Sequence, residues 1–203
     1  MTVLLIADEA RKAAWLSTGQ TAEIELIVSE EITEAPADAC IDLLFDGSAE
    51  RIASLTTAKF PLVLVHSLET LLKNLPDHFV RINGWLTFLE RNMVEACAPA
   101  PQKPATEVLL KNFNRTLTWV PDITGLLSAR VVAGIINEAY LALEEGLSTA
   151  EEIDTAMKLG TNYPYGPLEW CDRIGKKHVQ QLLRKLHAEN LRYQPAEGLS
   201  VKE

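Results

Sequence analysis

The feature that most constrains the fold of this sequence is a change of pattern near Pro121. From Val3 to about Val120, short apolar runs alternate with segments whose apolar residues recur at helical spacing. Beyond Pro121 only helical spacing is found. The first pattern is typical of a mostly parallel sheet covered by helices, and the second of an all-α region. The sequence therefore predicts an α/β domain over residues 1–121 and an all-α domain over residues 122–203.

The predicted elements of the first domain follow from this alternation. Seven apolar runs are predicted strands: Val3–Ala7, Ile24–Val28, Ile41–Phe45, Leu62–Val65, Phe79–Asn83, Met93–Cys97 and Thr116–Val120. Four segments between them are predicted helices: Glu9–Leu16, Ser48–Leu55, Leu68–Leu72 and Thr106–Phe113.

The second domain carries three helical patterns. A long helix has an apolar face made by Leu127, Val131, Ile135, Ala139 and Leu143. A second is predicted to start in a capping box of Ser148 and Glu151, to end at Gly160, and to bury Ile153, Ala156 and Met157. The last helix buries Val179, Leu182, Leu183 and Leu186. Because the long helix is apolar over more surface than a small helical unit can cover, we expect a homodimer.

Composition excludes several classes of function. A net charge of −9 argues against nucleic acid and anionic membrane surfaces as partners, since both require clustered Lys and Arg. The three cysteines are too widely separated to suggest a disulfide framework or a metal site. The sequence has no apolar run of the roughly 18 residues that a membrane helix needs, and its start lacks the features of a signal peptide. We therefore expect a cytoplasmic protein.

Several segments of the second domain closely resemble the C-terminal domain of the 3-hydroxyacyl-CoA dehydrogenases. They are Asn137–Ala139, Glu144–Gly146, Glu152–Gly160, Tyr163–Glu169 and Arg192–Pro195. The resemblance implies a role in fatty acid metabolism and dimerisation through this domain. It also implies that the first domain is a shortened Rossmann-like domain that has lost one or more strand–helix units, because the His66–Ser67 segment comes early in the chain.

The same resemblance extends thinly into the first domain and names candidate site residues. Along Phe79–Trp85 and Met93–Glu95, Asn83 falls where the family has its catalytic histidine, and Glu95 falls on that histidine's partner glutamate. Val65–Leu68 resembles a loop that contacts substrate, which adds Ser67 and His66 to the candidates. In the stretch Gly125–Arg130, Ala129 replaces a functional asparagine of the family.

The replacement of histidine by Asn83 bears directly on catalysis. In such an enzyme, a histidine removes the proton of the 3-hydroxyl group, because its pKa lies near neutrality. An amide has no proton to exchange, although it can donate a hydrogen bond to a 3-oxo group. His66 and His78 are candidates for a relocated base, but both are better explained as ordinary loop histidines. Glu95 has the alternative explanation of an outward-facing strand residue.

The cofactor motif is also missing. A dinucleotide-binding fold places G-x-G-x-x-G between its first strand and helix, where bare backbone approaches the pyrophosphate. Ala7–Lys12 stands there instead, and Asp8 and Glu9 place negative charge beside the expected phosphates. Asp8 is better explained as the cap of the following helix. We therefore predict no cofactor-binding residues, and NAD only if the site has been rebuilt.

Three hypotheses for function remain at this point. The first is a catalytically impaired relative, a pseudoenzyme that retains acyl-CoA binding and dimerisation. The second is an active NAD-dependent 3-hydroxyacyl-CoA oxidoreductase with a rebuilt site, in which His66 acts on the substrate. The third is a non-enzymatic scaffold for protein interaction.

Overall fold

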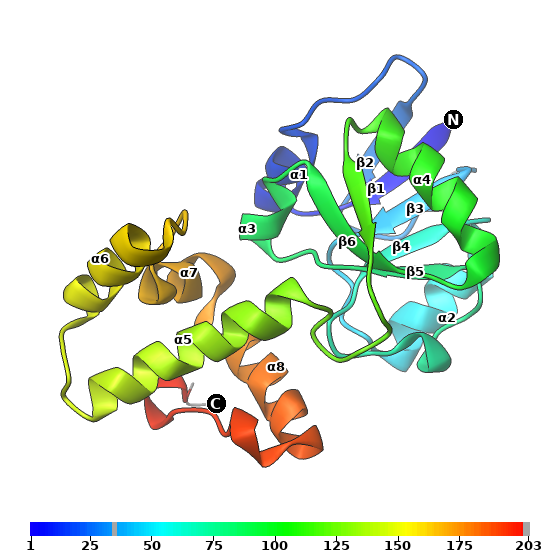
Figure 1. Ribbon diagram of the computed structural model, residues 1–203. Coiled ribbons are helices and arrows are strands. Elements are labelled where there is room, and N and C mark those ends of the chain that lie inside the picture. The colour runs from blue at the N-terminus through cyan, green and yellow to red at the C-terminus, as the bar shows by residue number, and fades with distance from the viewer. Residues whose placement is uncertain (34–35, 201–203) are drawn as a thin grey trace. The chain divides into compact units, whose positions relative to one another are not determined.

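The chain folds into two compact units, Met1–Leu126 and Leu127–Glu203, and the computed structural model describes residues 1–33 and 36–200 (Figure 1). The division falls a few residues beyond the predicted boundary after residue 121. Residues 122–126 lie with the first unit, because the Asp122 carboxylate accepts a hydrogen bond from the amide of Leu72, and the amide of Gly125 donates to the carbonyl of Leu68. The α/β class of the first unit and the helical class of the second are confirmed.

A seven-stranded sheet with the order β2-β1-β3-β4-β5-β6-β7 forms the centre of the first unit. All neighbouring strands are parallel except β5 and β6. The seven predicted strands are all present, and all but β6 have one or both ends displaced by one to three residues: β1 Thr2–Ile6, β2 Glu25–Ser29, β3 Ala39–Asp42, β4 Val63–His66, β5 Phe79–Ile82, β6 Met93–Cys97 and β7 Thr116–Trp119.

Four α-helices accompany the sheet: α1 Glu9–Leu16, α2 Ala49–Thr57, α3 Leu86–Leu89 and α4 Lys103–Asn112. The predicted helix Leu68–Leu72 was wrong, since only a short 3-10 turn, Leu72–Asn74, forms in that region. The carbonyls of Ser67 and Leu68 are instead bound by the side chain of Arg81, so they cannot join a helical ladder. Helix α3 was not predicted.

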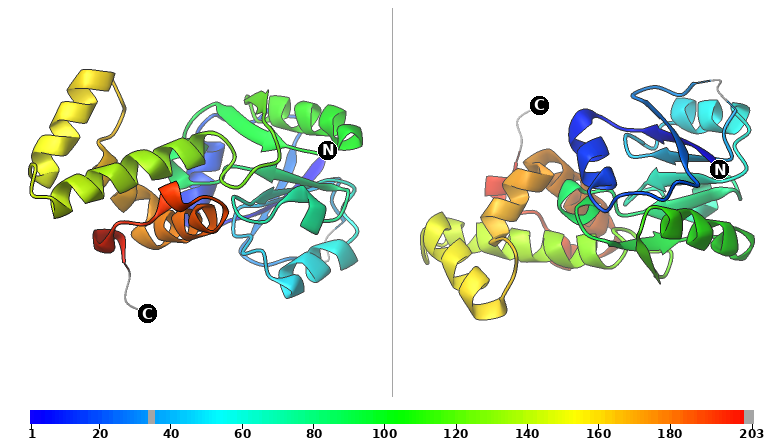
Figure 2. Two further views of the ribbon diagram at one scale, coloured as in Figure 1. Left: turned by 60° about the horizontal axis from the view of Figure 1, so that its bottom comes forward. Right: turned by 90° about the horizontal axis from the view of Figure 1, so that it is seen from above.

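Alternation along the strands supplies two apolar cores. Leu5, Leu64 and Ile82 face one side and pack with residues of α1, α3 and α4, among them Trp15 and Leu109. The intervening strand residues pack against α2 on the opposite side of the sheet, as Figure 2 shows for α2 and α4. The sheet is therefore the middle layer of a three-layer unit.

A short connection joins β2 to β3. Because β1 lies between these two strands, the chain must cross it, and it does so over residues 30–38 with no helix among the described residues of that segment. Ile32 and Ala37 of this segment pack into the core beneath α2. The strand order changes direction between β1 and β3, which makes their carboxyl ends the topological switch point where open α/β sheets bind ligands.

The second unit contains α5 Ser128–Glu144, α6 Ala150–Thr161, α7 Pro167–Ile174 and α8 Lys176–Glu189. The capping box lies one residue later than predicted, because Thr149 caps the amide of Glu152 and the Glu152 carboxylate returns to the amide of Thr149. Gly160 lies inside α6, and the helix ends at Asn162 in the left-handed conformation. The predicted inner face of α6 was right only in part: Ile153 and Met157 are half-buried, Ala156 is exposed, and no residue of the helix is fully buried.

Two side chains in the segments that resemble the family, Asp154 and Asn137, make hydrogen bonds between different parts of the helical unit. The Asp154 carboxylate accepts hydrogen bonds from the amides of Leu168 at 2.8 Å and Glu169 at 3.0 Å, and so caps α7 from α6. The Asn137 side chain bonds the carbonyl of Gln194 at 2.9 Å and the amide of Ala196 at 2.8 Å, which fastens the C-terminal segment to α5. These residues therefore hold the helical unit together.

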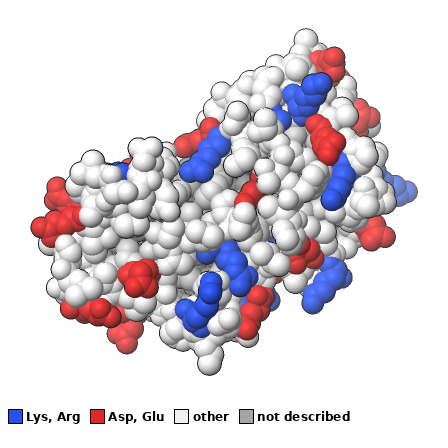
Figure 3. Space-filling model, viewed as in Figure 1, with Lys and Arg blue, Asp and Glu red and all other residues white. Residues whose placement is uncertain are grey.

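On the side drawn in Figure 3, acidic and basic side chains are interspersed. Among the residues that the structure describes, no helix is long and apolar enough to cross a membrane. The described residues also contain no cluster of His, Cys, Asp and Glu that could hold a metal ion.

Candidate functional site

Strand register brings three of the four predicted site residues together. The amide of Ser67 donates to the carbonyl of Ile82 at 3.3 Å, which continues the pairing of β4 with β5. The amide of Asn83 donates to the carbonyl of Glu95 at 3.4 Å, which continues the antiparallel pairing of β5 with β6. Laterally paired residues direct their side chains to the same face of a sheet. Ser67, Asn83 and Glu95 are therefore neighbours, and all three are buried.

His66 lies apart from these three residues. It is paired with Ile82 and so belongs to the opposite face of the sheet. Its Nδ1 accepts a hydrogen bond from the amide of Gly84 at 2.9 Å, which requires a lone pair on Nδ1 and, in the neutral ring, places the proton on Nε2. A Cβ at Gly84 would come within 2.6 Å of the His66 Cβ, so this contact depends on a glycine. A ring held in this state is poorly suited to accept a proton from a substrate.

Asn83 presents an unsatisfied donor. Its Oδ1 accepts a hydrogen bond from the amide of Trp85 at 3.2 Å, which fixes the orientation of the carboxamide. Its Nδ2 is buried and has no hydrogen-bond acceptor among the described residues. A buried donor without a partner costs about 1–3 kcal/mol, and such groups are rare in folded proteins. An acceptor supplied by a ligand would remove this cost.

Three other candidates, Ser67, Glu95 and His78, differ in their surroundings. The Ser67 hydroxyl donates to the carbonyl of Thr70 at 2.9 Å, so it fastens its own loop and is not arranged as a nucleophile. Glu95 is buried and lies opposite Asn83 in the strand register, so it is not an outward-facing strand residue, and its role as a partner stays a prediction. His78 lies before β5, with burial lowering the pKa of its imidazole and Asp77 opposing this.

Two further residues adjoin the site and were not predicted. Arg81 is fully buried in β5, two residues before Asn83, and forms an ion pair with Asp122. The sequence does contain a signal for it, since a single arginine interrupts the otherwise apolar strand Phe79–Ile82. A charged residue in such a strand needs a partner, but the sequence does not say which one.

The turn between β1 and α1 does not fit a dinucleotide in the usual pose. Oδ1 of Asp8 accepts a hydrogen bond from the amide of Arg11 at 2.8 Å, and the Asp8 carboxylate also pairs with the Arg11 guanidinium. The helix N-terminus, where a cofactor phosphate would bind, therefore already holds a carboxylate. Glu9 adds a second negative charge, only partly balanced by Lys12 at 3.1 Å. Where the sequence lacks the glycine loop, the structure thus has a helix that is capped by its own aspartate, Asp8.

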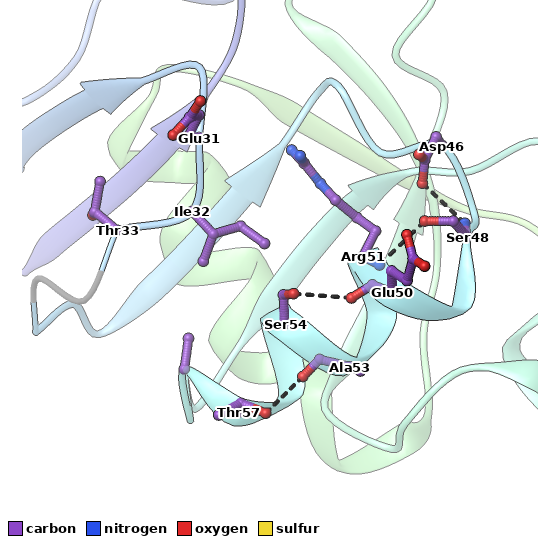
Figure 4. A pocket seen from close by; sticks show the side chains of 11 residues that line it. Glu31, Ile32, Thr33, Asp46, Ser48, Glu50, Arg51, Ala53, Ser54 and Thr57 are labelled. Atoms are coloured by element: carbon purple, nitrogen blue, oxygen red, sulfur yellow. Dashed lines mark hydrogen bonds between the residues drawn. The ribbon is translucent and has the colours of Figure 1, made fainter.

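An open pocket lies between α2 and the segment that follows β2 (Figure 4). The Arg51 guanidinium in its wall is matched by the buried Asp42 carboxylate, with contacts of 2.8 and 3.0 Å. The charged groups of the rim are otherwise acidic, which disfavours a phosphate. The lining residues are Glu31, Ile32, Thr33, Asp46, Ser48, Glu50, Arg51, Ala53, Ser54, Thr57 and Ala58. None of the four predicted site residues is among them.

Comparison with known proteins finds similarity to hydroxyacyl-CoA dehydrogenases. Residues 125–200 match the family model for the 3-hydroxyacyl-CoA dehydrogenase C-terminal domain. The chain is 40% identical over 106 residues to the 3-hydroxyadipyl-CoA dehydrogenase of Escherichia coli K12, covering 50% of this chain and 22% of that protein. It is 37% identical over 131 residues to human mitochondrial hydroxyacyl-coenzyme A dehydrogenase, covering 61% of this chain and 42% of that protein.

The fold is shared along nearly the whole chain. The structure of (S)-3-hydroxybutyryl-CoA dehydrogenase from Ralstonia eutropha superposes with a TM-score of 0.75 at 19% identity, covering 98% of this chain and 91% of that one. The sequence matches above span less than half the length of the curated relatives. Residues 125–200 therefore match the C-terminal domain of the 3-hydroxyacyl-CoA dehydrogenases, and the chain is similar in sequence over part of its length, and in fold over most of it, to proteins of that name.

Proposed function

We propose that this protein binds a 3-oxoacyl-CoA thioester without oxidising or reducing it. The observation that carries the proposal is the buried, unpaired Nδ2 of Asn83. A 3-oxo group accepts hydrogen bonds and donates none, so its oxygen complements this donor. Ser67, just beyond β4, and Glu95, within β6, lie on either side of Asn83 in the strand register. The relatives' names, which refer to hydroxyacyl-CoA dehydrogenases, supply the class of ligand.

The absence of redox chemistry is part of the proposal and rests on two features. The amide of Asn83 cannot take the proton of a hydroxyl group, and the only lone pair of the neutral His66 ring is held by Gly84. The N-terminus of α1 is capped by Asp8, which leaves the usual phosphate position occupied. An active enzyme with a rebuilt site would have to overcome both.

We also propose that the protein is a homodimer that associates through its helical unit. Leu127 and Val131 at the start of α5 are 55% and 51% exposed, and Leu159 on α6 is 83% exposed. None of the described residues of α6 is buried, which is unusual for a helix with apolar side chains at Ile153 and Met157. Burial of these side chains in a second copy would remove the exposed apolar surface. Light scattering at micromolar concentration should give the mass of a dimer, and a monomer would contradict this.

Titration calorimetry with acetoacetyl-CoA tests the ligand. We expect binding, and an affinity about fivefold lower for Asn83→Ala, since one hydrogen bond contributes on the order of 1 kcal/mol. Asn74→Ala removes an exposed asparagine of the same unit and should bind like wild type. NADH should give no heat at hundreds of micromolar and should not be consumed in the presence of acetoacetyl-CoA.

The outcomes separate the three hypotheses. Consumption of NADH would establish an active oxidoreductase, and its loss in His66→Ala would assign the base to His66. No binding of acetoacetyl-CoA by the dimeric wild-type protein would refute the ligand and leave the interaction scaffold. Equal binding by wild type and Asn83→Ala would place the ligand elsewhere.

A further inference from the structure

The side chain of Arg81 connects three parts of the first unit. Its Nε donates to the carbonyl of Ser67 at 3.1 Å, and its Nη2 donates to the carbonyls of Leu68 at 3.2 Å and Ile123 at 3.3 Å. Its Nη1 pairs with the Asp122 carboxylate. The arginine thus joins β5 to the segment that leaves β4 and to the segment that leaves β7.

Asp122 extends this cluster. Besides Arg81, its carboxylate accepts hydrogen bonds from the amide of Leu72 at 3.1 and 3.2 Å. The amide of Gly125 donates to the carbonyl of Leu68 at 2.6 Å, close to the same guanidinium. We call Arg81 and Asp122, with the backbone of residues 67–72 and 122–125 that they bind, the Arg81 clamp.

A contribution to stability does not by itself explain a buried ion pair such as Arg81–Asp122. Removing a guanidinium from water is costly, and apolar residues of similar volume often replace buried ion pairs without loss of stability. What an apolar residue cannot do is bind three carbonyls and a carboxylate in one fixed arrangement. The clamp therefore specifies where two irregular segments lie.

The clamp lies next to the proposed acyl site. Arg81 and Asn83 are two residues apart in one extended segment and so share a face of the sheet. Ser67, whose carbonyl the clamp holds, is paired with Asn83 across the sheet. A shift of residues 67–72 would move Ser67, the neighbour of the Asn83 side chain on the same face of the sheet.

From this arrangement we propose that Arg81 and Asp122 are positioning residues of the acyl-binding site, which hold the Ser67 loop and the Asn83 amide in the geometry that receives the 3-oxo group. The proposal rests on the proposed function for the identity of the ligand. The claim that Arg81 and Asp122 hold the Ser67 loop and the Asn83 amide in place does not depend on the ligand and can be tested without it.

The first experiment is amide hydrogen exchange on Asp122→Asn, which removes the charge and keeps the shape. We expect exchange at least tenfold faster in residues 67–72 and 122–126, and no change in α4. Glu9→Gln, which neutralises an acid of an exposed ion pair in the same unit, should leave both segments unchanged. Unchanged exchange of residues 67–72 in Asp122→Asn would overturn the clamp.

The second experiment follows the Asn83 side chain by nitrogen-15 NMR, with its amide signal assigned through Asn83→Ala. In Asp122→Asn and Arg81→Lys we expect this signal to shift or broaden, while those of Asn74 and Asn190 stay in place. A signal that does not move would overturn the positioning role even if the variants were less stable.

The third experiment measures affinity for acetoacetyl-CoA in a double-mutant cycle. Asp122→Asn should weaken binding about five- to tenfold in the wild-type background and hardly at all in Asn83→Ala. Equal losses in both backgrounds would show that the clamp acts independently of Asn83, against the proposal. If the wild-type protein does not bind acetoacetyl-CoA, the ligand is refuted, while the exchange and NMR results still decide the clamp.

Discussion

Replacement of Gly166 by alanine tests the contact that joins α6 to α7. The φ of Gly166 is −71°, which any residue adopts, so only space can require a glycine there. A Cβ at this position would overlap Cβ, Cγ and Oδ1 of Asp154. The Asp154 carboxylate would have to withdraw from the amides of Leu168 and Glu169, which it caps at 2.8 and 3.0 Å.

The expected loss can be worked out from these contacts. A side-chain cap at a helix N-terminus contributes about 1–2 kcal/mol, and forcing an extra methyl group into a filled space costs about 1–3 kcal/mol. We therefore expect Gly166→Ala to lower the free energy of unfolding by about 3 kcal/mol. Gly160→Ala is the matched control, because its Cβ would meet nothing within 4 Å. Inside α6 this control should raise the free energy of unfolding by about 0.5–1 kcal/mol.

Urea unfolding followed by circular dichroism measures both variants at a fixed protein concentration. Asp154→Ala loses the cap without the overlap and should cost about 1–2 kcal/mol. Asp154→Ala removes the Cγ and Oδ1 that the new methyl group would meet but keeps the Cβ, which it would meet at 2.4 Å. Because the cap can be lost only once, the double variant should lose less than the sum of the two separate losses, but more than Asp154→Ala alone. Strictly additive losses, or a Gly166→Ala protein as stable as wild type, would refute this account of the glycine.

Three more predictions concern the first unit and the thiols. Arg115 donates to the carbonyls of Trp15 at 2.6 Å, Leu89 at 2.9 Å and Arg91 at 2.6 Å, so Arg115→Met should cost about 3 kcal/mol in urea unfolding, while the same change at the exposed Arg184 should cost almost nothing. Burial lowers the pKa of His78, so the unfolded chain takes up a proton below about pH 6.5 before the folded chain does. The stability that comes from a neutral His78 is therefore complete above about pH 6.5 and is lost as the pH falls through the pKa of the folded protein. Between pH 7 and 5.5 the free energy of unfolding should fall less in His78→Gln than in wild type. An equal fall in both proteins would contradict this. Burial raises the pKa of Cys40, Cys97 and Cys171, so none should react quickly with a thiol reagent at pH 7.5 until urea unfolds the protein.

Local signals sufficed for much of the fold. The runs beginning at Val3 and Phe79 are apolar enough to be strands in any arrangement, and β6 Met93–Cys97 has the predicted bounds. The helix after Asp8 was predictable because an aspartate cap acts within one turn of chain. Errors arose where a distant residue competes for the backbone, as Arg81 does for the carbonyls of Ser67 and Leu68.

The candidate site shows the same division. The resemblance to the 3-hydroxyacyl-CoA dehydrogenases named Ser67, Asn83 and Glu95 as candidates, with an amide where that family has its base, and these roles stay predictions. The protonation of the His66 ring was beyond the sequence, because it depends on the amide of Gly84, a contact between different strands. The sequence also could not predict that the Asn83 Nδ2 has no hydrogen-bond partner, because this depends on all the groups that pack around that atom.

By itself, the sequence determined the two classes of structure, the seven strands, the helical unit and the loss of the glycine loop, because periodicity, capping and missing residues are properties of neighbouring positions. Only the tertiary structure decided which of the candidate residues share a face, that His66 is turned away from them, and that Arg81 and Asp122 lie beside them. The physical reason is that strand register and the pairing of buried charges join residues far apart in the chain, and their energies depend on the packed geometry.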